Sequence, residues 1–205
     1  MRGPAYRIET ERLLLRCLEP TDAEPMNAAV EVSLEHLRPW MPWAMGDVPT
    51  IDERIAWLRS QRGAFDLDRD YAYGVFEPTG REVLGASGLH TRAGEGAREI
   101  GYWVHVDHVG KGYATELAAA LTKVAFEVNG VDRVEIRCDP TNVRSAAVPR
   151  KLGYELEATL RRRTTDSHGA PRDTMLFSLF ADTYPGTPAS RAELRAFDAA
   201  GRRLL

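Results

Sequence analysis

A glycine-bearing junction between two regular patterns constrains this chain more than any other feature of its sequence. The segment 109–116 reads Val-Gly-Lys-Gly-Tyr-Ala-Thr-Glu; it follows an apolar strand pattern and opens an Ala/Leu-rich helical pattern over residues 113–128. Such a junction presents free backbone N–H groups at the positive end of the helix dipole. It therefore predicts either a phosphate site or a turn that needs only the dihedral angles of glycine.

The spacing of this segment excludes two phosphate-binding motifs. His105 stands five positions before Gly110, where a Walker loop has glycine, and Lys111 is followed by Gly112 rather than by Ser or Thr. Thr115 stands where a dinucleotide fingerprint has its third glycine. Any phosphate held here is held by a loop of another kind.

The order of the elements predicts an α/β or α+β layer arrangement with a mixed sheet. Helical patterns follow Asp22 and Thr50, and Glu53 completes a capping box with Thr50. A further helix is expected over residues 142–152, and strands are expected over residues 8–18, 71–76, 83–90, 99–106, 134–138, 154–162 and 174–180. We expect residues 1–182 to form the domain and residues 183–205 to form a C-terminal appendage of helical character.

Composition narrows the class of partner. A formal net charge of -3 over 205 residues argues against a chain held directly to nucleic acid by its overall charge. No run approaches the ~20 apolar residues of a membrane span, and the first seven residues hold no apolar run of signal-peptide length. Cys17, Cys138 and the five histidines show no metal-site spacing. We expect a cytoplasmic protein that binds neither metal nor membrane.

Four segments, in this order and spacing, carry a resemblance to a known family. They are Glu9–Arg16 (Glu-Thr-Glu-Arg-Leu-Leu-Leu-Arg), Leu37–Trp43 (Leu-Arg-Pro-Trp-Met-Pro-Trp), Glu99–Glu116, and Asn142–Tyr154 with its Lys-Leu-Gly-Tyr ending. Together they resemble the GCN5-related N-acetyltransferases (GNAT), and within them the RimJ/RimL-like ribosomal-protein N-terminal acetyltransferases. The resemblance implies the GNAT fold: a mostly antiparallel sheet of about six or seven strands, splayed at its middle and flanked by about four helices.

The resemblance also implies acetyl-CoA as the acyl-donor cosubstrate. Backbone groups of the splayed strand would meet the pantetheine, and the glycine loop would wrap the pyrophosphate. Val109 departs from the Gln or Arg common in the family, so we expect weaker or differently arranged phosphate binding. The residues implied in cofactor binding are Trp103, Val104, His105, Val106, Val109, Gly110, Lys111, Gly112, Tyr113, Ala114, Thr115, Asn142 and Ser145.

Acyl transfer from a thioester to an amine needs a neutral amine, a donor to the oxyanion and a proton for the departing thiolate. We expect the oxyanion donor at a backbone N–H near Val104. Many family members place a tyrosine where this chain has Pro149; in the RimL-like branch a serine, here Ser145, supplies the proton. Asn142 and Ser145 also fit a helix cap and its first-turn neighbour. Pro149 should bend this helix, because it lacks the N–H that would donate to Ser145.

Two residues are candidates for the general base. Glu99 would reach the amine through water, and His90 titrates near physiological pH. The base carboxylate of the RimL-like branch maps onto Thr164, with Asp166 close by. An α-amine with a pKa near 8 is about one-tenth neutral at pH 7, against less than about a thousandth for lysine. A site without a strong base therefore favours an α-amine.

Trp40 and Trp43 either line the acceptor side or fill the core, and Arg161–Arg163 either receive an acidic acceptor or remain solvated. The leading prediction is direct transfer of acetyl from acetyl-CoA to a primary amine, a protein or peptide N-terminal α-amine. One alternative is a small-molecule N-acyltransferase acting on an amine metabolite, an aminoacyl nucleotide or an antibiotic. The other is a catalytically weak CoA-binding regulatory protein. A longer or succinyl donor and a homodimer stay open.

Overall fold

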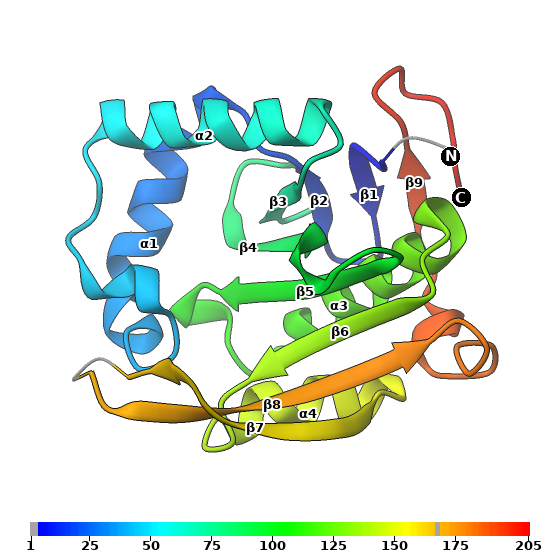
Figure 1. Cartoon of the computed structure of the whole chain (residues 1–205). Helices are drawn as coiled ribbons and strands as arrows, with labels where there is room; N and C mark the ends of the chain where they lie inside the picture. Colours follow the sequence, from blue (N-terminus) through cyan, green and yellow to red (C-terminus); the bar gives the residue numbers. More distant parts are fainter. Residues whose placement is uncertain (1–3, 167–168) are drawn as a thin grey trace.

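The computed structural model describes residues 4–166 and 169–205 (Figure 1). Residues 1–3, part of the stretch searched for a signal peptide, and His168 of the histidine set lie outside the described residues. The strands are β1 (Arg7–Glu9), β2 (Leu14–Cys17), β3 (Tyr71–Phe76), β4 (Val83–His90), β5 (Ala97–Val104), β6 (Arg133–Cys138), β7 (Glu155–Thr165), β8 (Pro171–Phe180) and β9 (Arg195–Phe197). The α-helices are α1 (Ala23–Leu37), α2 (Ile51–Asp66), α3 (Tyr113–Val124) and α4 (Val143–Leu152).

Within the described residues, the nine strands form one sheet in the order β7-β8-β6-β5-β4-β3-β2-β1-β9. Neighbouring strands run antiparallel except β5 and β6, which are parallel. The pairing of β5 with β6 ends at Ile100 and Ile136, after which β5 continues beside β4 and β6 beside β8. This divergence confirms the predicted mixed sheet that splays at its middle.

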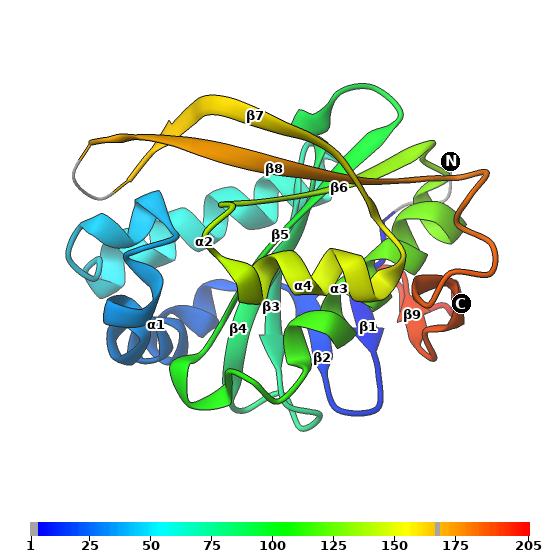
Figure 2. The ribbon, with the colours of Figure 1, turned by 90° about the horizontal axis from the view of Figure 1, so that it is seen from below.

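The helices form two pairs, one on each face of the sheet (Figure 2). Helix α1 packs on α2, and α3 packs on α4. Ala72 belongs to the apolar cluster that contains α1, whereas its neighbours Tyr71 and Tyr73 belong to the cluster that contains α3 and α4. Because successive strand side chains point to opposite faces, the two clusters lie on opposite sides of the sheet.

The predicted strand over residues 8–18 is instead the hairpin of β1 and β2. The Thr10 amide donates to the Leu13 carbonyl at 2.9 Å, and the Leu13 amide donates to Thr10 Oγ1 at 3.1 Å. This reciprocal pair turns the chain in the middle of a run that alternation alone reads as continuous. The extra strand and β9 raise the sheet from the expected six or seven strands to nine.

The C-terminal segment forms a strand where helical character was expected. After a short 3-10 turn at Ala189–Arg191, β9 pairs antiparallel with β1, and Ala196 is fully buried. Lys123 of α3 donates from Nζ to the carbonyls of Ser190 and Ala192, at 3.2 and 3.0 Å. Within residues 183–205, the three residues of β9 therefore extend the sheet, because the open edge of β1 offers them backbone partners.

Local sequence signals are confirmed where they set helix ends. Thr50 and Glu53 cap each other at the start of α2. The helical pattern over residues 113–128 becomes α3 followed by a π-helical turn at Ala125–Asn129.

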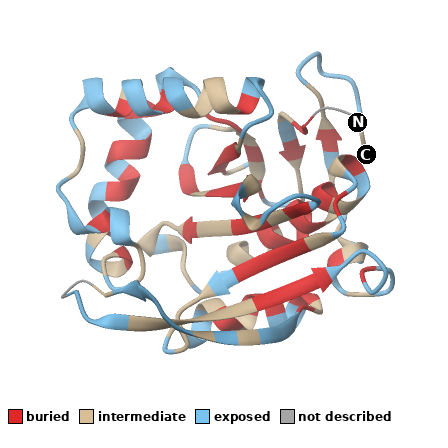
Figure 3. Cartoon of the chain, in the orientation of Figure 1, coloured by how far each residue is buried: buried red, intermediate tan, exposed pale blue. Residues whose placement is uncertain are grey.

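Much of β7 is exposed (Figure 3). Among the described residues, no helix combines the length and apolar character needed to cross a bilayer.

Candidate active site

The gap between β5 and β6 leaves backbone groups of β5 without a strand partner. The His105 amide donates to Leu84 on the β4 side at 2.8 Å, and the Gly101 carbonyl accepts from Ser87 Oγ at 2.8 Å. Because backbone groups alternate in direction along a strand, those of Tyr102 and Val104 turn toward the gap. The amide of Val104, near which the oxyanion donor is predicted, therefore points toward the gap.

The glycine loop carries a run of free amides. Gly110 and Gly112 adopt φ values of +79° and +86°, which favour glycine. The amides of Thr115 and Glu116 bond back to the Gly112 carbonyl. Within the described part of the chain, the amides of residues 110–114 form no hydrogen bond. Five free donors at the start of α3 have the arrangement that an anion site requires.

Arg12, in the turn between β1 and β2, braces this loop. Its Nη1 donates to the Lys111 carbonyl at 2.9 Å, and its Nε donates to a Glu116 carboxylate oxygen at 2.7 Å. Its guanidinium also lies 4.9 Å from the ring centre of Tyr113. The brace joins the first hairpin to the loop in which the anion would bind.

The neighbouring loop residues are partly engaged inside the protein. The Val106 amide donates to Ser33 Oγ at 3.1 Å, and the Val106 carbonyl accepts from the Val109 amide at 3.4 Å, so both backbone groups of Val106 already have partners within the protein. The Lys111 ammonium lies 3.2 Å from His108 Nδ1, and His108 Nε2 lies 2.9 Å from a Glu82 oxygen. The Lys111 side chain, which lies in the glycine loop, is exposed.

Ser145 lies in the first turn of α4, held by two different groups. Asn142 Oδ1 caps the helix by accepting from the Ser145 amide at 3.0 Å, so the expected cap is observed. The Tyr102 hydroxyl lies 3.4 Å from the Ser145 carbonyl and 3.3 Å from Ser145 Oγ. Pro149 lies inside α4 and has no amide to donate to that carbonyl. Tyr102 therefore replaces the missing helix donor.

Burial raises the pKa of Tyr102 above its ordinary value, although its hydrogen bond to Ser145 opposes the shift. Burial likewise raises the pKa of Cys138, at the end of β6, against the effect of its own hydrogen bond to Ser145. Both groups stay protonated at neutral pH. Ser145 is thus surrounded by neutral hydrogen-bonding groups.

The two predicted base residues are adjacent in the sheet and differ in surroundings. Glu99 is 6% exposed and accepts from Arg92 Nη2 at 2.5 Å, with Arg137 Nε at 3.5 Å. His90 pairs with Glu99 in register, and its Nδ1 lies 2.7 Å from Asp70 Oδ2. Glu99 is therefore held between two cations, whereas His90 keeps its Nε2 for another partner.

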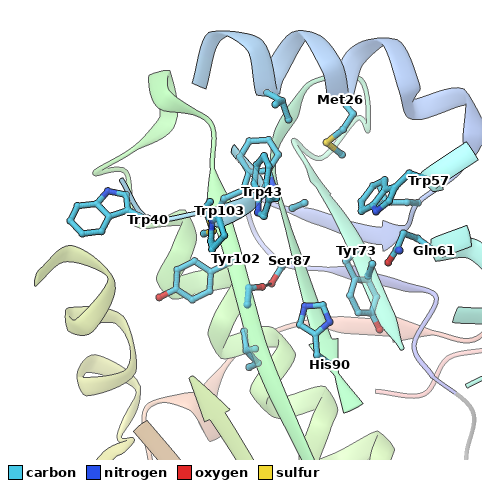
Figure 4. A pocket seen from close by; sticks show the side chains of 18 of the residues that line it. Met26, Trp40, Trp43, Trp57, Gln61, Tyr73, Ser87, His90, Tyr102 and Trp103 are labelled. Carbon is cyan, nitrogen blue, oxygen red and sulfur yellow. Dashed lines mark hydrogen bonds between the residues drawn. The ribbon is translucent and has the colours of Figure 1, made fainter. Parts of the chain in front are cut away.

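An open cavity of about 1170 Å³ extends from the gap to the space beneath α1 and α2 (Figure 4). Trp43 and Trp103 lie on its wall with ring centres 6.1 Å apart, and Trp43 is 50% exposed. Trp40 lines this cavity and a second one of about 480 Å³ beside the β7–β8 hairpin. Trp40 and Trp43 therefore line a cleft instead of filling a core, whereas Trp103 is buried in the apolar cluster that contains α1.

The β7–β8 hairpin contributes little of the predicted chemistry. Arg163 and Thr164 line the smaller cavity, whereas Arg161 and Arg162 are exposed strand residues outside the lining of both cavities. Asp166 lies in the hairpin turn, where Oδ1 accepts from the Ala170 amide at 2.8 Å. The structure brings neither Thr164 nor Asp166 into the lining of the larger cavity.

Three residues of this site were missed by reasoning from the sequence. Tyr102 contacts Ser145 across 43 positions, Asp70 contacts His90 across 20, and Arg12 contacts Glu116 across 104. No local pattern displays such contacts. The Glu-Ile-Gly-Tyr-Trp and Thr-Glu-Arg-Leu segments that contain Tyr102 and Arg12 were noted for their resemblance alone.

Comparisons with known proteins agree with this geometry. Residues 12–155 match the model of the acetyltransferase (GNAT) domain. The chain is similar to the uncharacterized N-acetyltransferase YoaA of Bacillus subtilis, with 25% identity over 173 residues, 84% of this chain and 95% of the relative. The ribosomal protein uS5-alanine N-acetyltransferase of Escherichia coli is 23% identical over 163 residues, 75% of this chain and 80% of the relative.

Among solved structures, RimJ of Mycobacterium smegmatis in complex with CoA-disulfide matches with a TM-score of 0.78 and 26% identity, covering 93% of this chain and 91% of that one. Within the described residues, no group of three or more His, Cys, Asp or Glu side chains is arranged to hold a metal ion. The matched domain covers more than half of the chain, and the splayed sheet and glycine loop occupy the expected places. The chain therefore belongs to the GNAT family of N-acetyltransferases and resembles its RimJ/RimL-like ribosomal-protein acetyltransferases.

Proposed function

We propose that this N-acetyltransferase moves the acetyl group of acetyl-CoA directly onto the N-terminal α-amine of a protein or peptide. The observation that carries the proposal is the gap between β5 and β6. On its β5 side the chain continues from Val104 through a short turn into the free amides of residues 110–114, and Tyr102 and Ser145, which border the gap, line the tryptophan-containing cavity. An acyl donor with a pyrophosphate and a narrow pantetheine chain would suit the loop and the gap. An amine with its substituent would suit the cavity.

The loop amides would bind the pyrophosphate, while Tyr102 and Val104 would offer backbone groups to the pantetheine. In RimJ of Mycobacterium smegmatis the corresponding fold was solved with a CoA disulfide, which supports CoA as the ligand. The Val104 amide would donate to the oxyanion that forms at the thioester carbonyl. These donors are positioned before the reaction, because the sheet fixes their direction.

Ser145 would protonate the departing thiolate. The amine nitrogen forms a bond to the acetyl carbon, the C–S bond breaks, and the sulfur takes the hydroxyl proton of Ser145. One amine proton leaves to a base before attack, and the second restores the Ser145 proton through solvent. Acetylated amine, CoA thiol and one proton on the base complete the balance.

The acceptor is assigned from the base chemistry and from the relatives. Glu99 is paired with Arg92 and Arg137, so this carboxylate is not a strong base for a lysine side chain. An α-amine with a pKa near 8 needs far less help than a lysine side chain near 10.4. Relatives named for acetylation of ribosomal proteins favour a protein N-terminus over a small amine.

Release of CoA thiol tests the proposal. Acetyl-CoA is mixed with peptides that have a free α-amine, with the same peptides blocked at that amine, and with small amines. We expect release with the free α-amine peptides, and S145A should lower kcat while acetyl-CoA binding persists. S60A, on the exposed surface of α2, is the matched serine control. Binding of CoA without any turnover would instead favour a regulatory CoA-binding protein.

A further inference from the structure

We propose that Asp70 and His90 act as a pair in which Asp70 positions the imidazole and His90 Nε2 removes the proton from the acceptor amine. This inference rests on the proposed function, since it names the base of the same reaction. It assigns Glu99 a structural place in the ion-pair network. Three separate observations support the proposal: the contact of His90 with Asp70, the two glycines that lie next to the imidazole ring, and the ion pairs that Glu99 forms with arginines.

Asp70 fixes the ring from one edge. Its Oδ2 lies 2.7 Å from His90 Nδ1, while its Oδ1 accepts from the Thr91 amide at 3.1 Å. Burial would raise the pKa of Asp70, but the contact with His90, together with hydrogen bonds from the Thr91 and Tyr71 amides, outweighs it, so the pKa lies below its ordinary value. An ionised carboxylate only accepts hydrogen bonds, so Nδ1 carries the proton, and in the neutral ring Nε2 keeps a lone pair.

Two glycines make room for the ring. Gly88 on β4 and Gly101 on β5 are direct partners across the sheet. A Cβ at residue 88 would lie 2.6 Å from His90 Nε2, and one at residue 101 would lie 3.5 Å from it. The ring therefore lies over a pair of positions without side chains, which gives Nε2 a fixed place. Both His90 and Gly101 line the larger cavity, and Figure 4 shows His90 beside Ser87 in that cavity.

The acid and the base approach the gap from opposite faces of the sheet. His90, Gly88 and Gly101 share the face of Ala72 and Trp103, which is covered by α1 and α2. Tyr102 lies between Gly101 and Trp103 and points to the other face, where it meets Ser145 of α4. A thioester placed in the gap would have a base on its amine side and an acid on its sulfur side.

Several charged side chains lie around the imidazole or line the same cavity. Groups from each neighbouring element contribute, and Arg92 is already paired with Glu99 at 2.5 Å. The charged side chains that contact His90 or line the same cavity are Asp70, Arg92, Glu99, Arg137, Asp139, Asp47, Glu53 and Arg54. Asp70 is the carboxylate in direct contact with the ring, so its removal is the change to which the base should respond most.

The test compares H90Q, D70N and the control D68N, whose parent carboxylate bonds the Tyr71 hydroxyl instead of a histidine. We expect H90Q to lower kcat for a free α-amine peptide by about 10²-fold or more, with acetyl-CoA affinity unchanged. D70N should lower kcat/KM at least tenfold and move the acid limb of the pH profile to lower pH, because the imidazolium loses its carboxylate partner. D68N should match the wild type.

An acyl hydrazide, which is uncharged at neutral pH, separates a base from a structural residue. H90Q should acetylate the hydrazide at nearly the wild-type rate while it fails with the α-amine, since the hydrazide has no proton to lose before attack. Equal loss with both acceptors would overturn the assignment, as would wild-type rates and pH profile in H90Q and D70N. If the wild type itself releases no CoA thiol with any acceptor, the proposed function fails, and this inference with it.

Discussion

Replacing Tyr102 with phenylalanine should destabilise the protein, and the size of the loss should depend on Pro149. In a regular helix the amide at position 149 would donate to the carbonyl at position 145. Proline has no such amide, and the Tyr102 hydroxyl lies 3.4 Å from that carbonyl and 3.3 Å from Ser145 Oγ. Y102F removes the substitute donor, whereas P149A restores the original one.

The magnitude follows from these contacts. A hydrogen bond between neutral groups contributes about 0.5–1.5 kcal/mol, and a buried acceptor left without a donor costs about 1–3 kcal/mol. Both Tyr102 distances are long for hydrogen bonds, which places Y102F near the lower end, about 1 kcal/mol. In the P149A background the same change should cost less than about 0.5 kcal/mol, because the new amide satisfies the carbonyl.

Urea unfolding of the wild type, Y102F, P149A and the double variant measures this coupling, provided that all four proteins unfold with the same m-value. We expect a coupling energy of about 0.5–1 kcal/mol, typical of residues that share one network. Additive effects of the two substitutions would refute the reasoning. In that case Tyr102 would not substitute for the missing helix donor, and the position of Ser145 would have another cause.

Three further predictions test other parts of the account. R12A should weaken acetyl-CoA binding several-fold in titration calorimetry, because the loop loses the hydrogen bond from Arg12 to the Lys111 carbonyl. The free energy of unfolding should change by no more than about 1 kcal/mol, as expected for a half-exposed ion pair. An unchanged affinity would show that Arg12 does not hold the loop in its binding conformation. Asp70 has a depressed pKa, so its contribution to stability is present above the unfolded pKa of about 3.9 and is lost as the pH falls through the lower folded value. D70N should therefore show a shallower loss of stability below about pH 4 in acid unfolding, and a curve identical to that of the wild type would count against the pairing. K123M should loosen the C-terminal segment, since the carbonyls of Ser190 and Ala192 lose their donor. We expect faster limited proteolysis within residues 185–194. An unchanged cleavage rate would show that the pairing of β9 is enough to hold the segment.

The parts of the fold that could be predicted from the sequence are those set by neighbouring residues. Thr50 and Glu53 form the predicted capping box because both partners lie within one helical turn. The junction at 109–116 joins a strand region to α3 as expected, since two glycines with positive φ end one element and open the next. Resemblance to the family then supplied the splay between β5 and β6.

The parts that could not be predicted depend on distant partners. The run over residues 8–18 keeps a strand-like pattern through the turn at Thr10–Leu13, so its hydrophobicity does not show where the hairpin forms. Strand β9 is three residues long and exists because β1 offers an open edge. Asp70 carries no local signal for its contact with His90, which depends on the packing of two strands.

The site that acquires the acetyl group tests the central claim most directly. A peptide carrying both a free α-amine and an internal lysine is incubated with acetyl-CoA and the protein, and tandem mass spectrometry locates the modification. The account predicts acetyl on the α-amine nitrogen, formed at the same rate as CoA thiol is released, with no acetyl left on the protein. Acetylation confined to lysine, or an acetylated protein without product, would contradict it.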